Sequence, residues 1–180
     1  MNRITTLISA GFGMLLLATA PAQAATITLT STLNGLNSAP QNASAATGTA
    51  MMSYDDVSNL FNLSIDITGI NKSVLNGAHI HLGGSGANGP VAFNLGTTAW
   101  TDTATGMNLI LTGGLFPGAN SSDLVFGKTY LNIHTLAFGA GEIRGQLTAA
   151  PVPVPAAAWL LGSGLLGLLG AASRKKVLRA

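Results

Sequence analysis

Hydrophobic and polar residues alternate along much of the middle of this chain, and the alternation predicts β-strands. The clearest case is 60–67, where Phe61, Leu63 and Ile65 alternate with polar residues. Side chains at i and i+2 lie on the same face of a strand, so this segment is expected to have one buried and one solvated face. Similar patterns predict strands at 25–33, 48–54, 77–82, 90–95, 129–136 and 142–148, with a short strand at 99–103.

Short strands separated by glycine-rich turns predict an all-β fold. We expect an antiparallel β-sandwich or Greek-key barrel, superoxide-dismutase-like or immunoglobulin-like, over 25–150. The segments 34–47 and 115–123 are rich in turn-forming residues and are expected to be loops. The apolar stretch 107–111 has no clear period, and we find no amphipathic helix in this middle region.

The N-terminal end, 1–24, has the pattern of a secretory signal peptide. Arg3 precedes an apolar run at 7–20, and Ala22-Gln23-Ala24 forms a small-residue cleavage site. We expect signal peptidase to cut after Ala24. An uncleaved membrane anchor is the alternative interpretation.

The C-terminal end, 151–180, has three parts in order. Residues 151–155 form a proline-rich spacer, which favours an extended chain. Residues 156–172 carry no charge and would rise about 26 Å as a helix, at the short end of what spans a bilayer. Residues 173–180 are basic and are expected on the cytoplasmic side. We therefore expect a transmembrane helix in the inner membrane, with 25–150 outside.

This tail resembles the C-terminal sorting signal of the PEP-CTERM class, in its VPLPA variant. The motif residues are Val152, Pro153, Val154, Pro155 and Ala156, with Val154 where that variant usually has leucine. The resemblance implies processing by an exosortase, a membrane protease of Gram-negative bacteria. It also implies a final location at the cell surface or in the extracellular matrix. A plain single-span anchor is the alternative.

The charges are segregated along the sequence. Between the two ends lie three basic residues and six acidic ones, a formal net charge of −3. Nucleic-acid binding requires a clustered basic surface, so this distribution argues against a nucleic-acid partner. The chain has no cysteine. An exported domain without disulfides must be held together by its core alone.

The three histidines of the chain lie on two of the predicted strands. His79 and His81 are two residues apart, so they share a face, with Cα atoms about 6.6 Å apart. Ile80 lies on the opposite face. If the apolar residues of the last two strands also face the core, their polar neighbours face outward. The polar residues assigned to outer faces are His79, His81, Asn132, His134, Glu142, Arg144 and Gln146.

These polar residues form one cluster if their strands are neighbours in a sheet. One interpretation is a metal site, because neutral imidazoles bind copper or zinc well and the three histidines offer three ligands. The other is a polar network in which the histidines bond to Glu142, to Asn132 or to loop backbone at 83–89. Glu142 and Arg144 are expected to form an ion pair on one face, which contributes little if exposed.

Three motifs resemble one family. They are AHIHLGGSGANGP at 78–90, NIHT at 132–135 and GEIRGQL at 141–147. Together they resemble the CHRD domain, named for its occurrence in chordin, and the match extends over about 27–148. The resemblance implies an extracellular β domain with no established enzymatic activity.

A weaker resemblance is to copper/zinc superoxide dismutase, in which His79, His81 and His134 would correspond to copper ligands. Three histidines cannot also supply a bridging histidine and a separate zinc site, and the disulfide of that family cannot form. The sequence contains no nucleophile elbow or phosphate-binding loop. We therefore expect a non-enzymatic protein with a structural or adhesive role in the envelope or matrix. A copper- or zinc-binding surface domain is the alternative.

Overall fold

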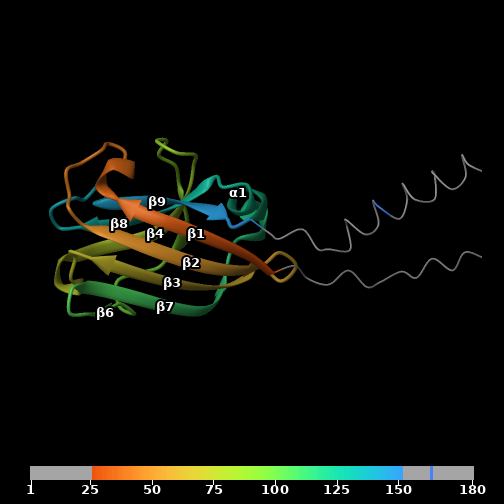
Figure 1. Ribbon diagram of the computed structural model, residues 1–180, viewed down its shortest axis with the longest axis horizontal. Helices are drawn as coiled ribbons and strands as arrows, with labels where there is room; N and C mark the ends of the chain where they lie inside the picture. Colours follow the sequence, from red (N-terminus) through yellow and green to blue (C-terminus); the bar gives the residue numbers. More distant parts are fainter. Residues whose placement is uncertain (1–25, 152–162, 164–180) are drawn as a thin grey trace, which may run out of the picture.

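The fold was analysed in a computed structural model, which describes residues 26–151 and Ser163. It consists of one nine-stranded sheet in the order β5-β4-β8-β9-β1-β2-β3-β7-β6, with every neighbouring pair antiparallel (Figure 1). The strands are β1 (Thr26–Asn34), β2 (Thr47–Asp55), β3 (Leu60–Thr68), β4 (Leu75–Leu82), β5 (Val91–Asn94), β6 (Thr101–Asp102), β7 (Gly106–Leu115), β8 (Thr129–Thr135) and β9 (Ile143–Ala149). The helical turns are η1 (Gly35–Asn37), η2 (Lys72–Val74), η3 (Gly118–Asn120) and α1 (Ser121–Val125).

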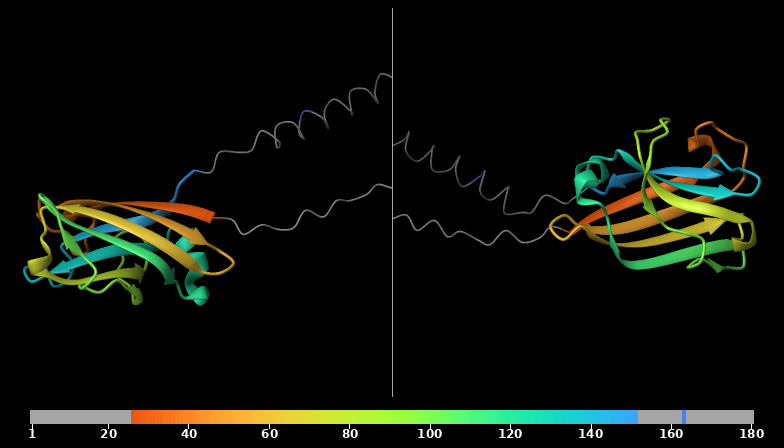
Figure 2. Two further views of the ribbon diagram at one scale, coloured as in Figure 1. Left: turned by 90° about the horizontal axis from the view of Figure 1, so that it is seen from below. Right: turned by 180° about the vertical axis from the view of Figure 1, so that it is seen from behind.

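The sheet curls into a half-barrel, so that its two halves face each other across the core (Figure 2). Phe61 of β3 and Phe93 of β5 lie far apart in the strand order, yet their rings meet edge to face with centroids 5.0 Å apart. The predicted all-β antiparallel class is confirmed. The finer prediction is a two-sheet sandwich or a Greek-key barrel. The structure has instead one continuous sheet curled into a half-barrel, because β1 pairs with both β2 and β9.

Alternation along the strands builds the core. In β3 the residues at 61, 63, 65 and 67 are buried and those between them are more exposed. Burial of such side chains supplies the main favourable term in folding. The largest fully buried side chains are Trp100, Tyr54, Tyr130, Phe61 and Phe116.

Two segments differ from the sequence prediction. The stretch 107–111 belongs to a longer strand, β7, which pairs with β3 along its length. The predicted loop 115–123 runs into the five-residue helix α1, although the sequence pattern indicated no helix here. A helix this short is one turn, and it forms because Leu124 is buried in the core rather than because of any long apolar period.

The first and last strands lie side by side and place both ends of the described chain at one end of the sheet (Figure 1). The amide of Ala150 donates to the carbonyl of Thr28 at 2.8 Å. The signal peptide 1–24, the motif 152–156 and the expected transmembrane helix 156–172 lie outside the described residues, apart from Ser163. Among the described residues, no helix is long and apolar enough to cross a membrane.

Truncation of a core side chain tests this arrangement. Leu131 is fully buried, whereas Leu136 is 72% exposed. We expect Leu131→Ala to lower the free energy of unfolding by about 2–5 kcal/mol, because it leaves a cavity in the core. The matched control Leu136→Ala should change it by no more than about 0.5 kcal/mol. Urea denaturation followed by circular dichroism measures both, and equal losses would contradict the assigned strand face.

Candidate metal centre

The three histidines lie on the outer face of two neighbouring strands, β4 and β8. In the register of this pair, His79 is opposite Asn132 and His134 is opposite Gly77. The alternate residues Ile80 and Ile133 are fully buried, so the histidines project away from the core, as the alternation predicts.

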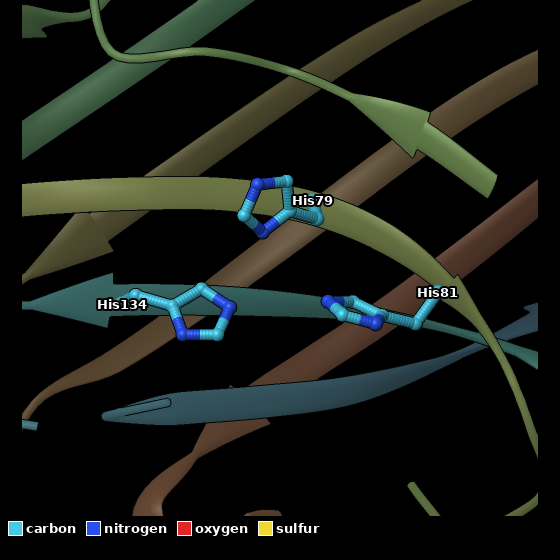
Figure 3. Close-up of side chains that lie close together, drawn as sticks. All are labelled: His79, His81 and His134. Atoms are coloured by element: carbon cyan, nitrogen blue, oxygen red, sulfur yellow. The ribbon is translucent and has the colours of Figure 1, made fainter. Parts of the chain in front are cut away.

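The three imidazole rings converge on one point. Each histidine offers a ring nitrogen, and these three atoms lie within 4.8 Å of one another. Figure 3 shows the rings of His79, His81 and His134 turned toward a common centre. The Nδ1 atom of His79 and the Nε2 atoms of His81 and His134 are buried without a hydrogen-bond partner. Unpaired buried polar atoms are costly, and three of the six among the described residues belong to these histidines.

Backbone carbonyl groups determine the tautomers of two of these rings. His81 Nδ1 lies 2.9 Å from the carbonyl oxygen of Gly89, and His134 Nδ1 lies 2.9 Å from that of Gly139. A carbonyl only accepts, so each Nδ1 carries the proton and donates it. The Nε2 atom of each ring then has a free lone pair, which is the arrangement common among metal-binding histidines.

Gly77 makes room for this packing of rings. A Cβ atom at this position would lie 3.1 Å from Cε1 of His79 and 3.8 Å from Cδ2 of His134. The first distance is tighter than ordinary van der Waals contact, so a larger residue would displace the His79 ring. Sequence reasoning missed Gly77, although it lies two residues before His79 and therefore on the same face.

The outer face beside the histidines is covered by the loop 83–90. Arg144 is only 2% exposed, and its Nη2 donates to the carbonyls of Gly84 at 2.8 Å and Ala87 at 2.9 Å. Its guanidinium lies 3.4 Å from the centre of the Tyr130 ring, which also stacks on His81 with centroids 5.0 Å apart. The outward assignment of Arg144 is therefore correct, but this residue is buried under a loop rather than exposed to solvent.

Glu142 and Arg144 do not form the predicted ion pair within the described part of the chain. The Glu142 carboxylate accepts one hydroxyl from Ser44 and one from Thr135, each at 2.6 Å. Arg144 instead bonds to loop oxygens. The prediction is wrong because Glu142 precedes β9, which begins at Ile143, so the strand alternation does not extend to it.

Asn132 takes no part in binding the histidine rings. It is 6% exposed, and its Nδ2 donates to the carbonyl of Ala140 at 3.2 Å. The predicted network of histidines with Glu142 or Asn132 is absent from the described hydrogen bonds, and only bonds to loop backbone are present. Those bonds leave one nitrogen of each ring free.

Burial and neighbouring charges lower the pKa of two of the imidazoles, which favours their neutral form. Burial lowers the pKa of His79, and the neighbouring His134 and His81 lower it further. Burial also lowers the pKa of His81, with His134 and Arg144 acting in the same direction against the Gly89 hydrogen bond. A neutral imidazole is the form that binds a metal ion.

These pKa shifts predict a pH-dependent stability of the metal-free protein. The unfolded chain protonates these imidazoles near pH 6.5, while the folded chain does so only at lower pH. The unfolded state then binds more protons just below pH 6.5, so the free energy of unfolding falls as the pH decreases through this window. Urea titrations of chelator-treated protein at about pH 7.5 and 5.5 measure the fall.

A double variant, His79→Gln with His81→Gln, should show a smaller fall over the same range. Asn76→Ala is the control, because Asn76 is an exposed residue of the same strand, β4. A fall as large in the double variant as in the wild type would contradict this assignment.

Comparison with known proteins agrees with the motifs. The family model of the CHRD domain matches residues 29–147, a range that includes all three histidines and the loop that covers Arg144. Searches of curated proteins and of solved structures each return no match. Because the family match covers more than half of the sequence, this chain belongs to the CHRD domain family.

Proposed function

We propose that this protein is an exported CHRD-domain protein that binds one copper or zinc ion through His79, His81 and His134. The observation that carries the proposal is the convergence of three buried, unpartnered ring nitrogens within 4.8 Å of one another. A bound ion would satisfy all three at once, whereas a single water molecule donates only two hydrogen bonds.

The donor set favours these two metals. The cluster consists of imidazoles alone, and the described residues add no carboxylate or thiolate to it. Imidazole suits copper and zinc, whereas calcium and magnesium prefer oxygen ligands. Three protein ligands leave one position of a tetrahedral ion open to a solvent molecule or a partner. The proposed role is binding rather than catalysis, since the family resemblance implies no enzymatic activity.

Export and surface location form the second part of the proposal. The CHRD domain suggests an extracellular or secreted protein, and the pattern of 1–24 supports cleavage by signal peptidase after Ala24. The order of 151–155, 156–172 and 173–180 supports insertion into the inner membrane and recognition by an exosortase. A structural or adhesive role at the surface or in the matrix of a Gram-negative bacterium remains a prediction.

Metal analysis tests the histidine site. Purified protein loaded with copper or zinc should retain one ion per chain, and its thermal midpoint should rise because the ion binds only the folded state. We expect His81→Ala to weaken binding by more than about 100-fold, since losing a ligand costs more than losing a group that merely supports one. Mass spectrometry under native conditions gives the stoichiometry.

The matched control for this experiment is Asn76→Ala, which alters β4 on a residue that contacts none of the histidines through a described hydrogen bond. It should bind as the wild type does. Retention of one ion by a folded His81→Ala variant, or no binding by the wild type, would exclude the proposed site.

Mass spectrometry of the protein isolated from its native cells tests the tail. Exosortase processing predicts a mature chain that begins at Ala25 and ends near Pro155. A plain anchor predicts a chain that still ends at Ala180. A mature chain beginning at Met1 would exclude cleavage by signal peptidase.

A further inference from the structure

We propose that the end of the sheet where β1 begins and β9 ends contacts the surface of a lipid bilayer. This end carries four exposed apolar side chains, which we call the terminal apolar group. Its members are Val57, Leu60, Leu115 and Phe126. The inference rests on the proposed membrane insertion of 156–172 and applies to the chain before exosortase cleavage near Pro155. It adds a second contact made by the folded domain itself.

Two members of the group are direct neighbours across a pair of strands. β3 begins at Leu60 and β7 ends at Leu115, and these two residues are opposite each other in the pairing of the two strands. Their side chains are 46% and 64% exposed. Val57 lies in the turn that joins β2 to β3, next to the start of β1, since Asp55 pairs with Thr26. These residues therefore lie at the end where the described chain begins (Figure 1).

Phe126 is held at the same end by the segment that follows α1. Its amide donates to the carbonyl of Ser122, and Gln146 of β9 donates to the carbonyl of Gly127 at 2.9 Å. Leu124, two residues earlier, is buried in the core. The Phe126 ring is nevertheless 76% exposed. These bonds hold the backbone of Phe126 at the surface, and an exposed apolar ring there suits the boundary between headgroups and acyl chains, where Trp, Phe and Leu side chains are buried.

The short spacer between the described domain and the expected membrane helix identifies a bilayer as the surface that this end contacts. The continuous described stretch ends at Pro151, and the uncharged segment 156–172 begins five residues later. In a proline-rich extended chain these five residues span only about 15 Å. An inserted tail therefore holds this end of the sheet close to the membrane surface, whereas a partner protein would have to share that narrow space.

The charges at this end favour neutral lipids. Asp55, Asp56 and Asp123 lie near the terminal apolar group, and Lys128 is the basic residue beside them. The Asp55 carboxylate accepts the amides of Val57 and Ser58 at 2.9 Å and so shapes the turn that presents Val57. This net negative charge provides no attraction to anionic lipids, so the contact must come from apolar side chains.

A single introduced cysteine tests the contact, because the chain has none of its own. The chain from Ala25 to Ala180, without the signal peptide, is reconstituted in phosphatidylcholine vesicles, and a nitroxide is attached to Phe126→Cys. The control is Leu136→Cys, which is 72% exposed and follows β8 at the opposite end of the sheet. We expect a several-fold lower collision rate with a water-soluble nickel chelate at position 126 than at 136. Collisions with oxygen, which partitions into lipid, should change in the opposite direction.

The measurement separates the inference from the proposed anchor. Vesicle flotation comes first: if the chain does not float with the vesicles, the anchor fails and the inference fails with it. If it floats but both labels are equally accessible to nickel, the anchor stands and the bilayer contact is excluded. Protection at 126 that disappears when the protein is diluted in lipid would assign this end to a second copy of the chain and would also overturn the inference.

Discussion

Burial of Ile80, Leu131 and Ile133 between the two halves of the curled sheet determines everything on the opposite face. Because side chains alternate strictly along a strand, fixing these residues in the core fixes His79, His81 and His134 outside it. A slip of one residue in the pairing of β4 with β8 would turn the histidines inward and expose the apolar side chains instead. The position of the histidine cluster therefore depends on the packing of the core beneath it.

Backbone carbonyls, rather than acidic side chains, surround the cationic and imidazole groups of this face. Arg144 and the two histidines that donate from Nδ1 all bond to loop carbonyls. The loop can approach so closely because its glycines allow it: Gly83 has a φ of 144°, and a Cβ at Gly89 would collide with the carbonyl of Leu82. An acidic partner beside the rings would favour their charged form. Carbonyl groups carry no net charge, so burial still favours the neutral form of the rings.

Local periodicity predicted much of this structure, and non-local pairing accounts for what it missed. The strands of the histidine face and their orientation follow from alternation within a few residues, as at Ile80 and Ile133. Whether nine strands form one sheet or two depends on β1 pairing on both of its edges, which no local pattern encodes. The partners of Glu142 were missed for the same reason, since Ser44 is 98 residues away in the sequence. Tyr130 could have been found, because it lies on the same face as Asn132 and His134 at a spacing of two.

The histidine cluster lies on the side of the sheet and extends along most of β8. β9 finishes at the end that carries the tail, so its antiparallel neighbour β8 begins there. His134 is the next-to-last residue of β8, whereas His81 is opposite Tyr130, its second residue. A domain held near a membrane by 151–180 would therefore carry the cluster on the flank of the sheet, where the imidazoles project from its outer face. The terminal apolar group lies at the end of the strands instead, so a membrane contact and an ion-binding site would use different surfaces of one domain. This arrangement requires no movement within the domain, since one sheet carries both.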